Sequence, residues 1–157
     1  MVTPIIREGG RTSNSSLDFR KDDALIQRIN PPGLHQPPGY HHVTVADATR
    51  MVFLAGQCPL DKRGQLVGSG DLRAQVEQVI RNIVTALSCV GATAGDVVRT
   101  VIYVVSPDRD DLSLVWTILR NSAIATALST ASTLLGVSQL GYPGQLVEID
   151  VTAVLSG

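Results

Sequence analysis

The sequence has few aromatic residues, few cysteines and no excess of basic residues. Aromatic residues make up 4% of its 157 residues, and the only cysteines are Cys58 and Cys89. The two cysteines lie far apart and match no metal-ligand spacing, so we expect small buried apolar side chains and no metal site. The 13 basic residues do not exceed the 14 acidic ones, which argues against a nucleic-acid partner.

A long uncharged run covers residues 121–147, in a chain where 17% of residues are charged. A membrane span needs about 20 predominantly apolar residues, whereas Ser, Thr, Gln, Gly and Pro interrupt this run. It therefore belongs to a protein interior or to the wall of a site, and no membrane partner is expected. The short apolar run at the N-terminus is broken by Arg7 and Glu8, which excludes a signal-peptide core and predicts a cytoplasmic protein.

The length of the chain predicts one domain that buries about 70% of its unfolded surface. Residues 1–29 hold nine charged residues and show no sustained period, which predicts an arm that is flexible or docked on a neighbour. Four prolines and two glycines over residues 30–40 then enforce an extended or turning path. We expect the domain proper over residues 30–157, with its compact part from about Tyr40.

The rest of the chain divides into strands and two helices. Segments 41–47 and 51–57 are rich in β-branched and apolar residues and predict a hairpin. Asp71 is a good N-cap for an amphipathic helix over residues 72–90, and Gly91 is a plausible stop. The remaining predicted elements are a strand over 96–106, a helix over about 110–128, and strands over 132–138 and 146–155.

This order of elements, β-β-α-β-α-β-β, predicts an α+β layer in which two helices cover one face of one sheet. The strand at residues 101–105 is apolar on both alternating faces, which indicates burial on both sides of the sheet. Because no third helix is available, we expect the sheets of several subunits to face each other. A site between subunits is then natural.

Several stretches together resemble the RidA family, also called YjgF or endoribonuclease L-PSP. They are "PPGYHHVTV", "MVFLAGQCPLDKRGQLVG", "LRAQVEQVIRNIVTAL", "VGATAGDVVRTVIYV" and "PGQLVEIDVTAVL". The resemblance covers residues 29–155. It implies a chorismate-mutase-like fold with a mixed sheet, a homotrimer with three small-molecule clefts between subunits, and no cofactor.

In the deaminase branch of this family, the clefts hydrolyse reactive enamines and imines to a 2-keto acid and ammonia. An arginine holds the substrate carboxylate by a two-pronged ionic hydrogen bond. A glutamate positions the attacking water, and a tyrosine and backbone N–H groups orient the reacting atoms. The resemblance makes Tyr40 and Glu148 the catalytic candidates and Gly56 a ligand-binding one.

The arginine of the family pattern is absent, because Ser132 stands in its place. Thr133 and Leu134 follow it as further ligand-binding candidates. Trp116 replaces a family asparagine, and His41 and His42 replace a Ser-Gln pair. Glu148 aligns with the family glutamate once one extra residue is allowed in the turn at residues 141–144.

Each candidate also has a structural interpretation. Glu148 is either a general base or a carboxylate that fixes a turn at a subunit edge. Tyr40 either contacts a ligand or anchors the proline-rich loop. His42 shares a strand face with Tyr40 and could enter the cleft, although a surface or packed histidine is the more common case.

Three functions follow from these residues. The first is an enamine or imine hydrolase whose substrate lacks a carboxylate. Charged hydrogen bonds contribute about 1.5–3 kcal/mol each, so weak or absent 2-aminoacrylate activity is expected, unless Arg50, Arg99 or an arm residue replaces the lost cation. The second is a non-catalytic ligand-binding or regulatory trimer. The third, ribonuclease activity, rests only on a family name and is disfavoured by the near-neutral charge.

Overall fold

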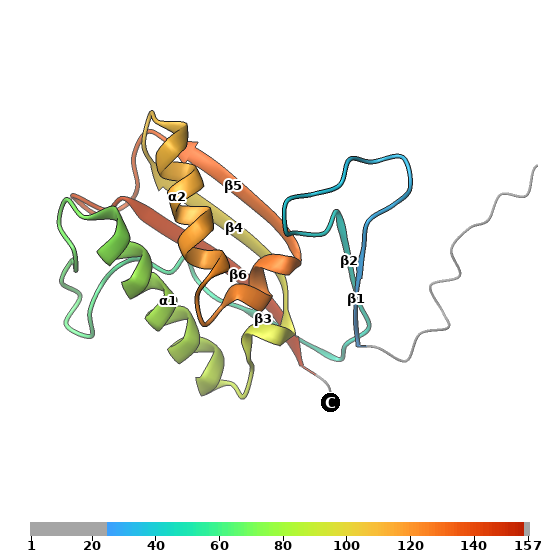
Figure 1. Ribbon diagram of the computed structural model, residues 1–157. Helices are drawn as coiled ribbons and strands as arrows, with labels where there is room; N and C mark the ends of the chain where they lie inside the picture. Colours follow the sequence, from blue (N-terminus) through green and yellow to red (C-terminus); the bar gives the residue numbers. More distant parts are fainter. Residues whose placement is uncertain (1–24, 156–157) are drawn as a thin grey trace, which may run out of the picture.

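The computed structural model describes residues 25–155 (Figure 1). The arm predicted over residues 1–29 lies outside the described residues, apart from its last five positions. Of these, Ile26–Ile29 form a short strand, β1, which pairs antiparallel with β2 at Val43–Ala46. The loop between β1 and β2 contains the proline-rich segment and lies to one side of the main sheet in Figure 1.

The main sheet has four strands in the order β3-β6-β4-β5. The strands are β3 at Arg50–Phe53, β4 at Val97–Val105, β5 at Ala131–Val137 and β6 at Val147–Leu155. The strands β4 and β5 are parallel, and the pairs β3·β6 and β4·β6 are antiparallel. The mixed sheet predicted from the sequence is therefore confirmed.

Two helices, α1 at Leu72–Cys89 and α2 at Arg109–Arg120, cover the same face of this sheet (Figure 1). The Asp71 side chain accepts a hydrogen bond from the Ala74 N–H at 3.1 Å, so the predicted N-cap of α1 is confirmed. Gly91 follows the helix with φ +76°, the left-handed conformation that ends a helix and favours glycine.

The core lies between the helices and the inner strands β4 and β6. Val76 and Ile83 of α1 are fully buried, as are Val115 and Leu119 of α2. They pack in one cluster with the sheet residue Ile102. Burying a side chain of this size contributes roughly 1.5–3 kcal/mol, so this layer sets the position of every strand that bears a candidate site residue.

The hairpin predicted over residues 41–57 is wrong. Its first strand, β2, pairs with β1, and its second, β3, pairs with the end of β6 at Thr152 to Leu155. Residue alternation and turn signals are local properties of the sequence. Strand pairing depends instead on which distant strand has an unpaired edge. Strand β6 pairs with β4 along one edge, and β3 pairs with the opposite edge of β6.

The second helix is also shorter than predicted, because α2 ends at Arg120 rather than near residue 128. The Ser122 hydroxyl donates to the Leu119 carbonyl at 2.8 Å and accepts from the Ile124 N–H at 3.2 Å. Such side-chain bonds satisfy the groups at the end of a helix and compete with further helical turns. The apolar residues that follow form a 3₁₀ helix at Ala125–Ser129 instead.

The face of the sheet that points away from the helices is here called the open face. Its exposed apolar side chains include Met51, Phe53 and Leu135, and Phe53 is 72% exposed. A large apolar area of this kind is typical of an interaction surface. Among residues 25–155, neither helix is long and apolar enough to cross a membrane.

Candidate functional site

An apolar pocket of about 180 Å³ lies between the β1–β2 loop, helix α2 and strand β5. Its lining residues are Pro38, Tyr40, Trp116, Ser132 and Leu134. Four residues predicted separately from the sequence therefore meet in one place. Small-molecule sites usually occupy about 300–1,000 Å³, so this pocket has room for only part of a ligand.

The loop that contributes Pro38 and Tyr40 is held by α2 and by the start of β5. The Trp116 indole N–H donates to the Pro38 carbonyl at 3.4 Å, and the Arg120 guanidinium donates to the Gly39 carbonyl. Gly39 has φ +101°, and a Cβ there would lie 2.6 Å from Arg120 Cζ. Only glycine therefore allows the arginine to close down on the loop at this point.

The Ser132 hydroxyl is already occupied within the chain. It accepts a hydrogen bond from the Thr100 hydroxyl at 2.7 Å and donates to the Leu128 carbonyl at 3.2 Å. A hydroxyl has one proton to donate, and here that proton is in use. Ser132 thus supplies neither a charge nor a free donor at the position where the family pattern has an arginine.

Two histidines surround Tyr40. The Tyr40 hydroxyl lies 3.3 Å from His35 Nε2, and the ring of Tyr40 meets that of His42 edge to face, with centroids 5.6 Å apart. His42 Nε2 donates to the His35 carbonyl at 2.9 Å. His42 therefore supports Tyr40 rather than lining the pocket. His35 was missed by sequence reasoning, since nothing but its place in the proline-rich loop marks it.

A second group of residues surrounds Glu148 on β6, and we call it the carboxylate cluster: Gly56, Cys58, Gln145 and Glu148. Gly56 and Glu148 were predicted as site residues, whereas sequence reasoning missed Cys58 and Gln145 as members of a site. The Gln145 amide donates to Glu148 Oε2 at 2.9 Å, and the Cys58 thiol donates to the same oxygen at 3.5 Å. A Cβ at Gly56 would lie 1.9 Å from Glu148 Oε1. Gly56 thus leaves the space in which the carboxylate lies.

The electrostatics of this cluster keep protons on its neutral donors. Burial and the nearby Glu148 charge raise the pKa of the Cys58 thiol from 9.0 to about 11. Partial burial and a hydrogen bond from its hydroxyl to Asp150, at 3.1 Å, likewise raise the pKa of Tyr103. Among residues 25–155, no group of three or more His, Cys, Asp or Glu side chains is arranged to hold a metal ion.

The pocket and the cluster lie on opposite faces of the sheet. Ser132 pairs with Thr100 of β4, a residue that points toward the helices and is only 1% exposed. Glu148 pairs with Tyr103 of the same strand. Side chains alternate along a strand, so positions 100 and 103 face opposite ways. Thr133, one residue beyond Ser132, is exposed on the open face and belongs to neither group.

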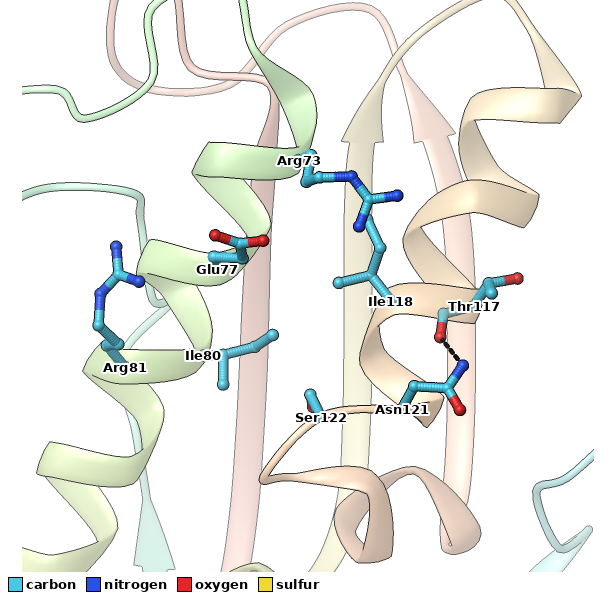
Figure 2. Close-up of a pocket in the computed structure, with 8 residues that line it drawn as sticks. All are labelled: Arg73, Glu77, Ile80, Arg81, Thr117, Ile118, Asn121 and Ser122. Atoms are coloured by element: carbon cyan, nitrogen blue, oxygen red, sulfur yellow. Dashed lines mark hydrogen bonds between the residues drawn. The ribbon is translucent and has the colours of Figure 1, made fainter.

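Two larger hollows lie elsewhere on the surface. Figure 2 shows a groove of about 450 Å³ between α1 and α2, where the Arg73 side chain extends from α1 toward Ile118 of α2. It contains no predicted site residue. A second cavity, of about 780 Å³, runs from Gly56 and Cys58 along α1.

Comparison with known proteins gives consistent matches over most of the chain. The family model described as Endoribonuclease L-PSP matches residues 34–155. Protein DfrA of Myxococcus xanthus is 34% identical over 115 residues, which are 73% of this chain and 84% of that protein. The matched range of the family model includes both the apolar pocket and the carboxylate cluster.

Solved structures agree with these sequence matches. The protein YyfB of Yersinia pestis, from the conserved Rid protein family, is 34% identical with a TM-score of 0.75, and the match covers 84% of this chain and 100% of that one. A YjgF-family protein of Mycobacterium tuberculosis is 30% identical with a TM-score of 0.54, covering 75% of this chain and 88% of that one. The predicted fold class is thereby confirmed.

Proposed function

The chain belongs to the endoribonuclease L-PSP family, and on that premise we propose that it hydrolyses small enamines or imines that lack a carboxylate. Water adds to the carbon of the C=N bond while the Glu148 carboxylate accepts a proton from it. The nitrogen then leaves as ammonia and a C=O bond remains. Tyr40 orients the substrate from the apolar pocket.

The observation that carries this proposal is the division of the predicted residues between two faces of the sheet. Tyr40 and Ser132 belong to a pocket that can hold only part of a ligand, and Glu148 lies on the opposite face. A single chain cannot bring them to one substrate. We therefore propose a homotrimer in which the pocket of one subunit faces the carboxylate cluster of the next.

The open face supports such an assembly. It exposes Met51, Phe53 and Leu135, and Leu135 lies in one cross-strand row with Tyr103 and Glu148. Burying this apolar surface against another subunit contributes about 25 cal/mol per Å², which favours association. The same contact would remove water from the surroundings of Glu148.

The substrate class follows from the hydrogen-bond donors and charges that the pocket offers to a ligand. Ser132 has no free proton, the Trp116 N–H is bonded to Pro38, and among residues 25–155 no basic residue lines the pocket. Arg120, at the end of α2, is bonded to the loop at Gly39. A carboxylate entering this pocket would lose its hydration without gaining a partner, whereas an uncharged apolar group would not.

Two imines with the same side chain test the proposal. Oxidation of leucine by an amino-acid oxidase yields an imine with a carboxylate, and oxidation of isopentylamine by an amine oxidase yields the same imine without it. Semicarbazide traps the free imine as a semicarbazone and itself displaces ammonia, so hydrolysis is read from the initial rate of semicarbazone formation. We expect the protein to accelerate hydrolysis, seen as slower semicarbazone formation, only for the neutral imine. Equal acceleration of both, or of the carboxylate form alone, would contradict the proposed substrate class.

A second function, a non-catalytic ligand-binding trimer, has one observation in its favour. The apolar pocket offers a ligand shape and apolar contact, because its polar groups are bonded within the chain. Trp116 fluorescence can measure the binding of isopentyl-type amines or alcohols. Binding of these ligands, together with no faster hydrolysis of any imine, would favour this function over the enzyme. Trp116 is the only tryptophan of the chain, so the signal reports on the pocket directly.

A further inference from the structure

The Glu148 carboxylate is held unevenly, and its two oxygens differ in what they contact. Oε2 accepts from the Gln145 amide at 2.9 Å and from the Cys58 thiol at 3.5 Å. The thiol has a second acceptor in the Gly56 carbonyl, at 3.6 Å, and the charged carboxylate is the stronger acceptor of the two. Within the part of the chain that the structure describes, no donor contacts Oε1, which lies over the Cα of Gly56. One oxygen is therefore anchored and the other is left free.

We propose that Cys58 and Gln145 are positioning residues that hold Oε2 of Glu148 and so make Oε1 the oxygen that takes the proton from water. This inference rests on the proposed function and extends it to residues that the family resemblance did not mark. In the attack step on the protonated imine, the water oxygen forms a bond to the imine carbon, the C=N electron pair moves to the positively charged nitrogen and leaves it as a neutral amine, and one water proton passes to Oε1.

The chemistry of Cys58 fits a donor and not a nucleophile. A thiolate beside Glu148 would place two negative charges together, and this repulsion together with burial raises the thiol pKa to about 11. The sulfur thus keeps its proton at neutral pH, and only a thiolate is strongly nucleophilic. A protonated thiol is a weak donor that can restrain a carboxylate without neutralising it.

Gln145 is itself fixed in the turn before β6. Its side chain is nearly buried, at 3% exposed, and its oxygen accepts from the Tyr142 N–H at 3.1 Å. Its amide nitrogen donates to the Val147 carbonyl at 3.2 Å as well as to Glu148. The donor that holds Oε2 is therefore part of a closed set of bonds, which orients the carboxylate before any ligand arrives.

The first experiment needs no substrate. In a Cys89→Ser background, Cys58 is the only thiol, and its alkylation by iodoacetamide is followed between pH 7 and 9.5. With a pKa of about 11, about 1% of the thiol is ionised at pH 9, against about half for an ordinary thiol. We expect slow alkylation that becomes at least about tenfold faster in Glu148→Gln, with circular dichroism as the check on folding. If Cys58 is alkylated at the rate of an ordinary thiol, and Glu148→Gln does not change that rate, Cys58 is not bonded to Glu148.

The second experiment measures hydrolysis of the neutral imine by Cys58→Ala and Cys58→Ser. For Cys58→Ala we expect kcat to fall about fivefold at constant KM, because a donor to the charged carboxylate is lost. Cys58→Ser keeps a donor and should recover most of the rate.

The outcomes separate this inference from the proposed function. Wild-type kcat and KM in Cys58→Ala would show that the thiol positions nothing. A serine variant as slow as the alanine variant, at unchanged stability, would assign the sulfur a chemical role and overturn the proposal. If no imine is hydrolysed at all, the proposed function fails, while the alkylation result still decides whether Cys58 is bonded to Glu148.

Discussion

The apolar pocket and the carboxylate cluster differ in what they leave unbonded. In the pocket, the Ser132 and Trp116 donors are already bonded to the chain, so the surface offered to a ligand is apolar. In the cluster, Glu148 keeps one oxygen without a donor among residues 25–155. Under the proposed function, the pocket selects the substrate and the cluster transfers the proton, so a complete site needs both.

Removal of the proposed base, Glu148, should have the largest effect on the rate of hydrolysis. Glu148→Gln keeps the shape of the side chain and still offers an oxygen to Gln145, but it cannot accept a proton from water. We expect the kcat for the neutral imine to fall about 10²- to 10⁴-fold, with ligand binding in the pocket nearly unchanged. Undiminished turnover in this variant would remove Glu148 from the mechanism.

A methyl group at Gly56 should displace the same carboxylate without removing its charge. Because a Cβ there would lie 1.9 Å from Glu148 Oε1, the side chain has to move, and a misplacement of about 1 Å can cost about 10²-fold in rate. Gly141→Ala is the matched control, since a Cβ at Gly141 meets nothing within 4 Å. Equal kinetics of the two alanine variants would contradict the assigned position of the carboxylate.

A cation in the pocket should change which substrate is selected. Ser132→Arg restores the two-pronged partner of a carboxylate, and we expect kcat/KM for the leucine-derived imine to rise about 10- to 100-fold. Thr117→Arg adds the same charge in the groove between α1 and α2, away from the open face, and serves as the control. A gain in both variants would mean that an added charge outside the pocket suffices and that the pocket does not select.

The smallest expected effect concerns stability at alkaline pH. Because the pKa of Cys58 is raised to about 11 in the folded protein, the unfolded chain releases this proton first, near pH 9. The contribution of the protonated Cys58 thiol to the free energy of unfolding is complete below pH 9 and is lost as pH rises through 11. Urea unfolding should show that the free energy of unfolding falls slightly less between pH 8 and pH 10.5 in Cys58→Ala than in wild type. A larger fall in the variant would contradict the raised pKa.

The sequence predicted those parts of the fold that depend on local pattern. The apolar period of residues 72–90 and the Asp71 cap identified α1, because helix formation is decided within a few turns. The hairpin at residues 41–57 was wrong because strand partners are chosen by distant segments, here β1 and β6. The end of α2 depended on two hydroxyl bonds of Ser122, which no apolar period records.

The candidate site was predicted only where a family pattern marks a residue. Tyr40, Trp116, Ser132 and Leu134 do meet in one pocket, although nothing in their spacing required it. Cys58 was expected to be a small buried apolar side chain, whereas it is only half-buried and contacts Glu148 across 90 positions of sequence. A lone cysteine without a motif gives no sign of such a partner.

The central claim is that one site takes its pocket and its base from different subunits, and mixing two inactive chains tests it most directly. Glu148→Gln chains keep the pocket, and Leu134→Trp chains, whose pocket is filled, keep the base. After random subunit exchange at equal amounts, about one quarter of the clefts pair an intact pocket with an intact Glu148. We predict that the mixture recovers about a quarter of the wild-type rate on the neutral imine. A mixture as inactive as its components would contradict the claim.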